Sequence, residues 1–126
     1  MARLLLDTHT VLWWLTDPEK LHRDAYQAIA NEQNEVFVSA VSGWEIAVKR
    51  ALGKLQAPDN LEASIKDQGF TPLSLTFSHA EQAGTLPPHH GDPFDRMLVA
   101  QAQAEALVLV TRDRHISRYD VRTMTA

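Results

Sequence analysis

The chain has 126 residues, of which 44% are hydrophobic, enough for one compact domain with its own core but not for two. It contains no cysteine, which excludes a disulfide framework, a thiolate zinc site and a thiol nucleophile. The formal net charge of −4 argues against a general electrostatic attraction to nucleic acid, so any RNA contact has to be local.

We expect a single domain over residues 1–126 in a reducing cytoplasm. The N-terminus lacks the charged and apolar regions of a signal peptide. No apolar run approaches the roughly 20 residues that a membrane span needs. A soluble, cytoplasmic protein is therefore the expectation.

Short apolar runs alternate with segments of helical periodicity along the chain. Apolar Leu21, Tyr26 and Ile29, after an Asp17-Pro18 start signal, predict the second helix. In chain order we expect a strand at Arg3–Leu6, a short helix carrying Trp13 and Trp14, a helix at Pro18–Glu32, a strand at Val36–Val38 and a helix from about Ser42 to Leu52, ending at Gly53. We then expect a helix from Asp59 to near Gly69, a strand at Phe70–Leu75, a helix at Phe77–Gly84, a loop at Leu86–Gly91, a helix from Asp92-Pro93 to Ala106, and strands at Leu107–Val110 and Tyr119–Met124.

Uniformly apolar strands separated by helices are typical of a parallel sheet covered on both faces, because such strands have no solvent-facing side. The pattern predicts a three-layer α/β/α sandwich with a central, mainly parallel sheet. In that architecture, groups at the carboxyl ends of the strands meet in one crevice, where ligands bind.

Four acidic residues fall at this edge of the predicted sheet. Asp7 ends the first strand and Asp113 follows a late one, while Glu45 and Asp95 lie in the first turns of helices next to strands. Carboxylates brought together repel unless a cation offsets their charge or some take up protons. Oxygen ligands without sulfur favour Mg²⁺ or Mn²⁺.

Each acid also has an ordinary structural interpretation. Asp7 could cap the following helix, Glu45 could form a helix-surface pair with Lys49, and Asp113 could be a turn residue. The case for a shared site rests on all of the acids falling on one edge of one sheet.

Asp92 and Asp95 compete for the same role. Asp92 precedes Pro93 and is best interpreted as a helix N-cap. Asp95, near the third helical position, is also favoured there by the helix dipole.

Four segments together resemble the successive motifs of PIN-domain ribonucleases, in order and in spacing. They are LLLDTH at residues 4–9, SGWEI at 42–46, DPFDRMLVA at 92–100 and VTRD at 110–113. The stretch from DPFDR to VTRD is similar to the form found in VapC-type toxins of bacterial toxin–antitoxin pairs. The resemblance implies a PIN-like fold and one or two Mg²⁺ or Mn²⁺ ions held by four acids, which are Asp7, Glu45, Asp95 and Asp113 here; the cap argument leaves Asp92 to structure.

The resemblance implies a metal-dependent endoribonuclease, in which a bound ion lowers the pKa of a water that attacks the RNA phosphodiester. VapC-type toxins form homodimers and receive a disordered antitoxin segment that folds on binding. We therefore expect an RNA substrate, a cognate antitoxin and a homodimer. Five successive apolar residues, 11–15, point all around one helix and predict that part of this helix is covered by another chain.

Other residues near the acids have two interpretations each. Thr111 could position a water or a ligand, or simply pack at a strand end. Arg96, Arg112 and Arg114 could hold phosphates or pair with nearby acids.

The histidines and tryptophans suggest structure more than metal binding. His9, and the adjacent pair at 89 and 90, lack the spacing of a zinc site, so loop structure is expected for the pair. Trp13 and Trp14 favour a core and interface role over base stacking. Trp44 is most simply a core residue that fixes the helix carrying Glu45.

Two other classes of protein remain as alternatives. A phosphoaspartate phosphatase or a receiver domain also begins with a strand-end Asp, here Asp7, as nucleophile or phosphate acceptor. The phosphatase pattern requires a second Asp at the position where this chain has His9. A receiver domain requires a Lys after a late strand, and the Thr111-Arg112-Asp113 segment contains none. A catalytically silent PIN-like binding module is disfavoured because all four acids are present.

Overall fold

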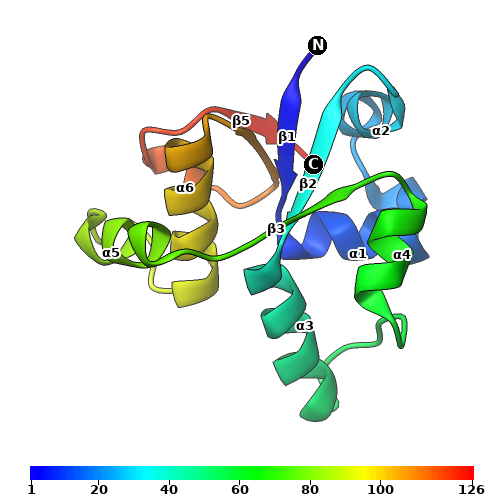
Figure 1. The fold of residues 1–126 in the computed structure, drawn as a ribbon, viewed down its shortest axis with the longest axis horizontal. Coiled ribbons are helices and arrows are strands. Elements are labelled where there is room, and N and C mark those ends of the chain that lie inside the picture. Colours follow the sequence, from blue (N-terminus) through cyan, green and yellow to red (C-terminus); the bar gives the residue numbers. More distant parts are fainter.

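The computed structural model describes residues 1–126 and is built on a five-stranded sheet in the order β3-β2-β1-β4-β5 (Figure 1). Every neighbouring pair of strands is parallel, so the expected mainly parallel sheet is entirely parallel. The strands are β1 at Arg3–Leu6, β2 at Glu35–Ser39, β3 at Thr71–Leu73, β4 at Val108–Thr111 and β5 at Thr123–Thr125.

Helices cover both faces of the sheet, with α5 and α6 on one side and α1, α2 and α4 on the other, while α3 extends beyond the carboxyl edge (Figure 1). They are α1 at Thr8–Thr16, α2 at Arg23–Ala30, α3 at Ala40–Ala51, α4 at Leu61–Asp67, α5 at Phe77–Thr85 and α6 at Pro93–Glu105, with 3₁₀ turns at Pro18–Lys20 and Ile116–Arg118. No helix combines the length and apolar composition required to cross a membrane.

The core has two halves because alternate residues of β1 point to opposite faces of the sheet. Leu4 and Leu6 belong to a cluster with residues of α1, α2 and α4. Leu5 belongs to a second cluster with residues of α6 and β4. All three side chains are fully buried, which confirms the predicted three-layer sandwich.

The single helix predicted at Pro18–Glu32 is divided, because the chain forms a 3₁₀ turn at Pro18–Lys20 and then the separate helix α2. The 3₁₀ turn ends at Leu21, whose backbone is extended, with φ −74° and ψ 143°. His22 then caps α2 by accepting a hydrogen bond from the backbone N–H of Asp24. This break turns Tyr26 outward, with 45% of its surface exposed, while Leu21 stays in the core.

Three other boundaries differ from the predicted ones. The strand expected at Phe70–Leu75 is only Thr71–Leu73, and the helix expected from Asp59 begins at Leu61. The last strand begins at Thr123, because the preceding residues form a 3₁₀ turn and a bend.

Candidate active site

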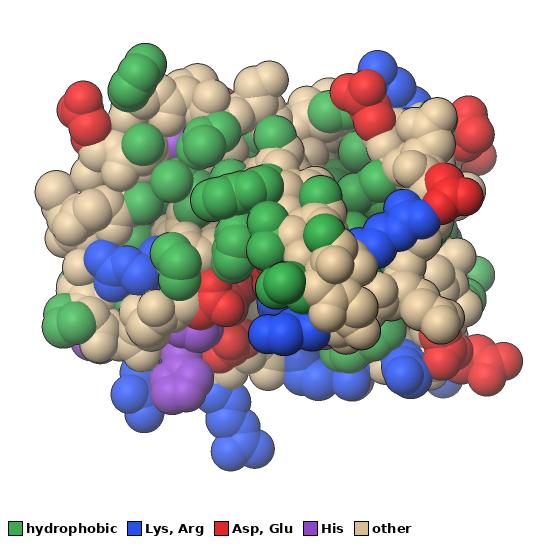
Figure 2. Space-filling view, turned by 90° about the horizontal axis from the view of Figure 1, so that it is seen from below, with side chains coloured by type: hydrophobic (Ala, Val, Ile, Leu, Met, Phe, Trp, Pro, Cys, Tyr) green, Lys and Arg blue, Asp and Glu red, His purple; other side chains and the backbone are tan.

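The carboxyl ends of β1 and β4 open into a polar cleft of about 460 Å³. In Figure 2, acidic side chains gather near the middle of this face, with histidine and basic side chains next to them. The cleft is lined by Asp7, His9, Trp13, Glu45, Lys49, His90, Asp92, Asp95, Arg112 and Asp113. The structure thus brings the four predicted acids together, and it also brings Asp92 to the same place.

Asp7 both caps a helix and faces the cleft, so its two interpretations are compatible. Its Oδ1 accepts hydrogen bonds from the backbone N–H and the hydroxyl of Thr10, at 2.9 and 2.5 Å. Its Oδ2 accepts one from the Thr111 hydroxyl at 2.6 Å. Asp7 is only 7% exposed. The turn from β1 into α1 therefore fixes this carboxylate at the sheet edge.

Glu45 does pair with Lys49, but the pair is not an ordinary surface contact. Glu45 is 3% exposed, and its Oε2 lies 2.5 Å from the Lys49 ammonium. This hydrogen bond raises the pKa of Lys49. The other oxygen, Oε1, accepts a hydrogen bond from the Thr8 hydroxyl at 2.6 Å.

Asp92 is the N-cap of α6, as predicted. Its Oδ1 accepts from the backbone N–H of Phe94 at 2.8 Å and of Asp95 at 3.3 Å, with Pro93 at the first helical position. Burial and the charge of Asp92 raise the pKa of Asp95 to about 7, with further contributions from Asp7 and Glu45. A cation close to Asp95 would stabilise the ionised form of this carboxyl group.

Asp113 and Asp95 both lie beside the same ring nitrogen of His90. The Nε2 atom of His90 lies 2.8 Å from Asp113 Oδ2 and 3.0 Å from Asp95 Oδ2. Burial raises the pKa of Asp113, but the hydrogen bonds from His90 and from the backbone of His115 outweigh it and lower that pKa below its usual value.

His90 is the site residue that the sequence analysis missed. Residues 86–91 form a loop as expected, yet the side chain of His90 is only 12% exposed and lies inside the cleft. A ring nitrogen of His90 and one oxygen each of Asp95 and Asp113 lie within 4.8 Å of one another. The sequence signal was its position two residues before the cap Asp92. His89, in contrast, packs against the ring of Tyr119 at 5.0 Å between centroids.

The three arginines differ in their surroundings, and only Arg112 stays a candidate for binding a phosphate at the cleft. Arg96 binds neither acid nor cleft, because its guanidinium donates to the backbone carbonyls of Ala83, Leu86 and Pro87 and so holds the loop before α6. Arg112 lines the cleft, with its guanidinium 4.3 Å from the centre of the Trp13 ring. Arg114 is exposed and outside the cleft lining.

Trp44 is not a core residue, contrary to the prediction. It is 62% exposed and packs edge-on against Phe94 at 5.0 Å between ring centroids. The reason is helical spacing: Glu45 and Ile46 take the buried positions of α3, which leaves the preceding residue on its outer face.

Helix α1 is covered by its own chain to a greater extent than predicted. Val11 and Leu12 are buried, and Trp13, Trp14 and Leu15 pack against the first core cluster. Trp13, Trp14 and Leu15 stay partly exposed, so coverage of this helix by another chain stays a prediction.

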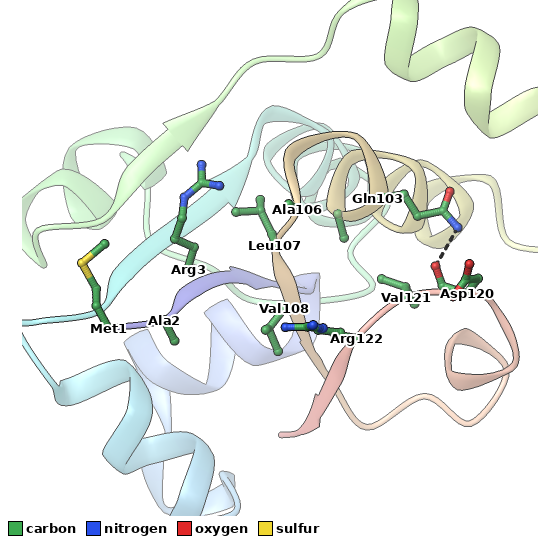
Figure 3. Close-up of a pocket in the computed structure, with 11 residues that line it drawn as sticks. Met1, Ala2, Arg3, Gln103, Ala106, Leu107, Val108, Asp120, Val121 and Arg122 are labelled. Carbon is green, nitrogen blue, oxygen red and sulfur yellow. Dashed lines mark hydrogen bonds between the residues drawn. The ribbon is translucent and has the colours of Figure 1, made fainter.

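A larger hollow of about 660 Å³ lies elsewhere, around the residues that begin β1 and precede β5 (Figure 3). Its polar groups include Arg3, Arg122 and the amide of Gln103, which donates to the backbone carbonyl of Asp120 at 3.1 Å. It gathers no cluster of acids, and it is at the edge opposite to the one where parallel sheets bind ligands. The polar cleft is therefore the better candidate, although it is smaller.

The donor groups of the cleft fit a divalent cation. Carboxylate oxygens dominate, no sulfur is present, and Lys49 is the ammonium that offsets part of the negative charge. Hard oxygen ligands of this kind prefer Mg²⁺ or Mn²⁺. Asp7, Glu45, Asp95 and Asp113 are the residues that could hold the ion.

Comparisons with known proteins agree in fold and family. The model of the PIN domain family matches residues 4–122. Ribonuclease VapC22 of Mycobacterium tuberculosis is 34% identical over 124 residues, which cover 92% of this chain and 91% of that protein.

Solved structures with the same fold include two DNA-bound VapBC assemblies. VapBC2 from Rickettsia felis, bound to a promoter DNA fragment, superposes with a TM-score of 0.70 at 13% identity over 97% of each chain. DNA-bound VapBC from Salmonella typhimurium gives 0.69 at 20% identity over 98% of each chain. At these identities the structures show a common fold.

Proposed function

Since the chain belongs to the PIN-domain family and to its VapC-type ribonucleases, we propose that it is a Mg²⁺- or Mn²⁺-dependent endoribonuclease, the toxin of a type II toxin–antitoxin pair. The observation that supports the proposal best is the single cleft at the carboxyl edge of the sheet that Asp7, Glu45, Asp95 and Asp113 line together. A ribonuclease relative of similar length supports the reaction class.

The proposed site residues hold their carboxylates in fixed orientations. Thr111 donates to Asp7, and Thr8 donates to Glu45, each through a hydroxyl at 2.6 Å. A divalent ion bound by these acids would activate a water for attack on phosphorus and stabilise the charge that develops on the phosphate. We assign Thr111 the role of orienting Asp7.

Local positive charge at the cleft supports an RNA substrate despite the acidic chain. Lys49 and Arg112 both line the cleft. The Nε and Nη2 atoms of Arg112 donate to the backbone carbonyls of Lys20 and Ala126. These contacts hold the guanidinium over Trp13 and leave Nη1 without a hydrogen-bond partner in the chain. A fixed guanidinium is well suited to a phosphate of the RNA backbone.

Cleavage of RNA by the purified protein tests this proposal. We expect cleavage with Mn²⁺ or Mg²⁺ and none with EDTA. Replacing any one of Asp7, Glu45, Asp95 or Asp113 by Ala should abolish most of the activity, and a second replacement should add little, because residues that act as a unit are not additive. Sequencing of RNA 5′ ends after induced expression would identify the target.

Two results would contradict the proposal. If Asp95→Ala cleaves RNA like wild type while Asp92→Ala is inactive, the cap and the ligand are assigned the wrong way round. If the protein instead accumulates a phosphoryl group on Asp7, the phosphatase interpretation replaces the nuclease.

A cognate antitoxin is the proposed protein partner. The solved structures named above are VapBC assemblies bound to DNA, and the VapC-type family to which the chain belongs is the toxin half of such pairs. We propose that a short gene next to this one encodes a protein that occupies the cleft and blocks it, and that both act in the cytoplasm, where RNA is accessible. Co-expression should abolish toxicity and RNA cleavage, and co-expression without any rescue of growth would contradict this.

A homodimer is also proposed, with α3 in its interface. Trp44, Val48 and Leu52 recur every four residues and form an exposed apolar stripe on this helix, with Leu52 64% exposed. Contiguous exposed apolar surface of this kind is typical of an interface. Light scattering should show a dimer that Val48→Asp converts to a monomer. A monomeric wild-type protein would contradict the proposal.

A further inference from the structure

We infer that His90 is a positioning residue of the metal site, one that donates its Nε2–H to Asp113, lies beside Asp95 and is not itself a ligand. The inference rests on the proposed metal-dependent function. The inference extends that function, because it names a residue other than the four acids that affects the affinity for the metal.

The protonated nitrogen of His90 follows from its backbone contact. The backbone N–H of Asp92 donates to Nδ1 of His90 at 3.0 Å, so Nδ1 has to present a lone pair. A neutral imidazole carries one hydrogen, and it is therefore on Nε2. A nitrogen that bears a hydrogen has no lone pair for a metal ion, so Nε2 acts here as a hydrogen-bond donor.

Two carboxylates from different parts of the fold lie beside this hydrogen. Nε2 donates to Asp113 Oδ2, beyond the end of β4, at 2.8 Å. It also lies 3.0 Å from Asp95 Oδ2, in the first turn of α6. Asp7 and Glu45 have hydroxyl donors of their own, so His90 contacts the other two of the four acids.

Donation by His90 leaves room for a metal ion. A carboxylate offers about four lone-pair positions. Asp113 uses one for His90 and one for the backbone N–H of His115, at 2.7 Å. Both Asp95 and Asp113 thus keep lone pairs for a cation while their orientation is fixed.

The loop that carries His90 is itself held in place. The backbone N–H of His90 donates to the Tyr119 hydroxyl at 3.0 Å, and that hydroxyl donates to the carbonyl of Pro87 at 2.8 Å. Arg96 donates to the same carbonyl at 3.0 Å. These contacts fix the imidazole before any ligand arrives, which is what an orienting residue requires.

Mn²⁺ affinity, measured by titration calorimetry, tests the inference with His90→Ala, His90→Gln and a neighbouring control, His89→Gln. Loss of a group that orients metal ligands typically weakens binding about 10- to 100-fold, and we expect that loss for His90→Ala. His90→Gln keeps an N–H donor and should recover most of the affinity. His89→Gln should bind like wild type, because His89 lies outside the cleft lining.

The nitrogen spectrum of the histidines is a second readout that does not depend on activity. In ¹⁵N-labelled protein at about pH 8, His90 should carry its hydrogen on Nε2 both without metal and with saturating Mg²⁺. Loss of that hydrogen on Mg²⁺ binding would make His90 a ligand and overturn the inference. Equal Mn²⁺ affinity in wild type and His90→Ala, or equal losses in His90→Ala and His90→Gln, would also overturn it.

The outcome for wild type separates this inference from the proposed function. If wild type fails to bind millimolar Mn²⁺, the proposed metal-dependent function is wrong and the role of His90 falls with it. If wild type binds Mn²⁺ and Asp7→Asn does not, the metal site stands, and the His90 variants decide the inference alone.

Discussion

At neutral pH about half of the Asp95 side chains in the metal-free protein should carry a proton, because burial and the charge of Asp92 raise the pKa of Asp95 to about 7. A carboxylate has to be ionised before it binds a metal. Binding of Mn²⁺ near pH 7 should therefore release a proton. The apparent affinity should fall roughly tenfold for each pH unit below 7 and level off above it.

The same pKa predicts a change in stability with pH. The ordinary value for this group is 3.8, which we take for the unfolded chain. The folded state disfavours the ionised form of Asp95. The resulting loss of folding stability is absent below about pH 4, where the group is protonated in both states, grows as pH rises, and is complete above about pH 7. A shift of about three units is on the order of 4 kcal/mol. The metal-free protein should lose stability across this range.

Thermal unfolding in EDTA and Mn²⁺ calorimetry, each at about pH 6 and pH 8, check this prediction. Asp95→Asn removes the ionisation, so its unfolding midpoint should depend less on pH than that of wild type. Mn²⁺ should stabilise wild type more at the higher pH. Equal pH dependence for the two proteins, or equal Mn²⁺ affinity at both pH values, would refute the reasoning.

Three further substitutions separate structural from site roles. Asp92→Asn keeps the helix cap, since Asn caps as well as Asp, but removes the charge beside Asp95. Stability in urea should be nearly unchanged, and Mn²⁺ should bind more tightly at about pH 6. Weaker Mn²⁺ binding would contradict this prediction. Thr111→Val leaves the Oδ2 atom of Asp7 without its hydroxyl donor, which should cost about 1–3 kcal/mol in urea unfolding and weaken Mn²⁺ binding. Unchanged affinity would dismiss the orienting role of Thr111. Arg96→Met removes donors to three backbone carbonyls and should speed amide hydrogen exchange in the loop before α6, so unchanged protection there would argue against the anchoring role.

Much of the fold could be predicted because β1 is uniformly apolar and helices separate the strands. Such strands have to be buried on both faces, and parallel strands end at a common edge. The position of Asp7 directly after Leu6 therefore predicts a carboxylate at that edge. Pro93 after Asp92 likewise predicted the start of α6 and its cap.

The rest depends on where individual side chains point, which a periodic pattern does not determine. His90 enters the cleft because Tyr119 and Arg96 hold its loop, and both contacts join residues distant in sequence or across a bend. Trp44 is apolar yet exposed, since its neighbour Glu45 takes the buried position. A hydrophobic pattern alone predicts only the environment that is usual for each residue type, which is a loop for His90 and the core for Trp44.

Diffraction at the manganese absorption edge, from crystals grown with Mn²⁺, tests the central claim most directly. The claim predicts anomalous density in the cleft, at coordination distance from oxygens of Asp7, Glu45, Asp95 and Asp113, with no bond from His90. Density at another place on the molecule, or an empty cleft at saturating Mn²⁺, would contradict the account.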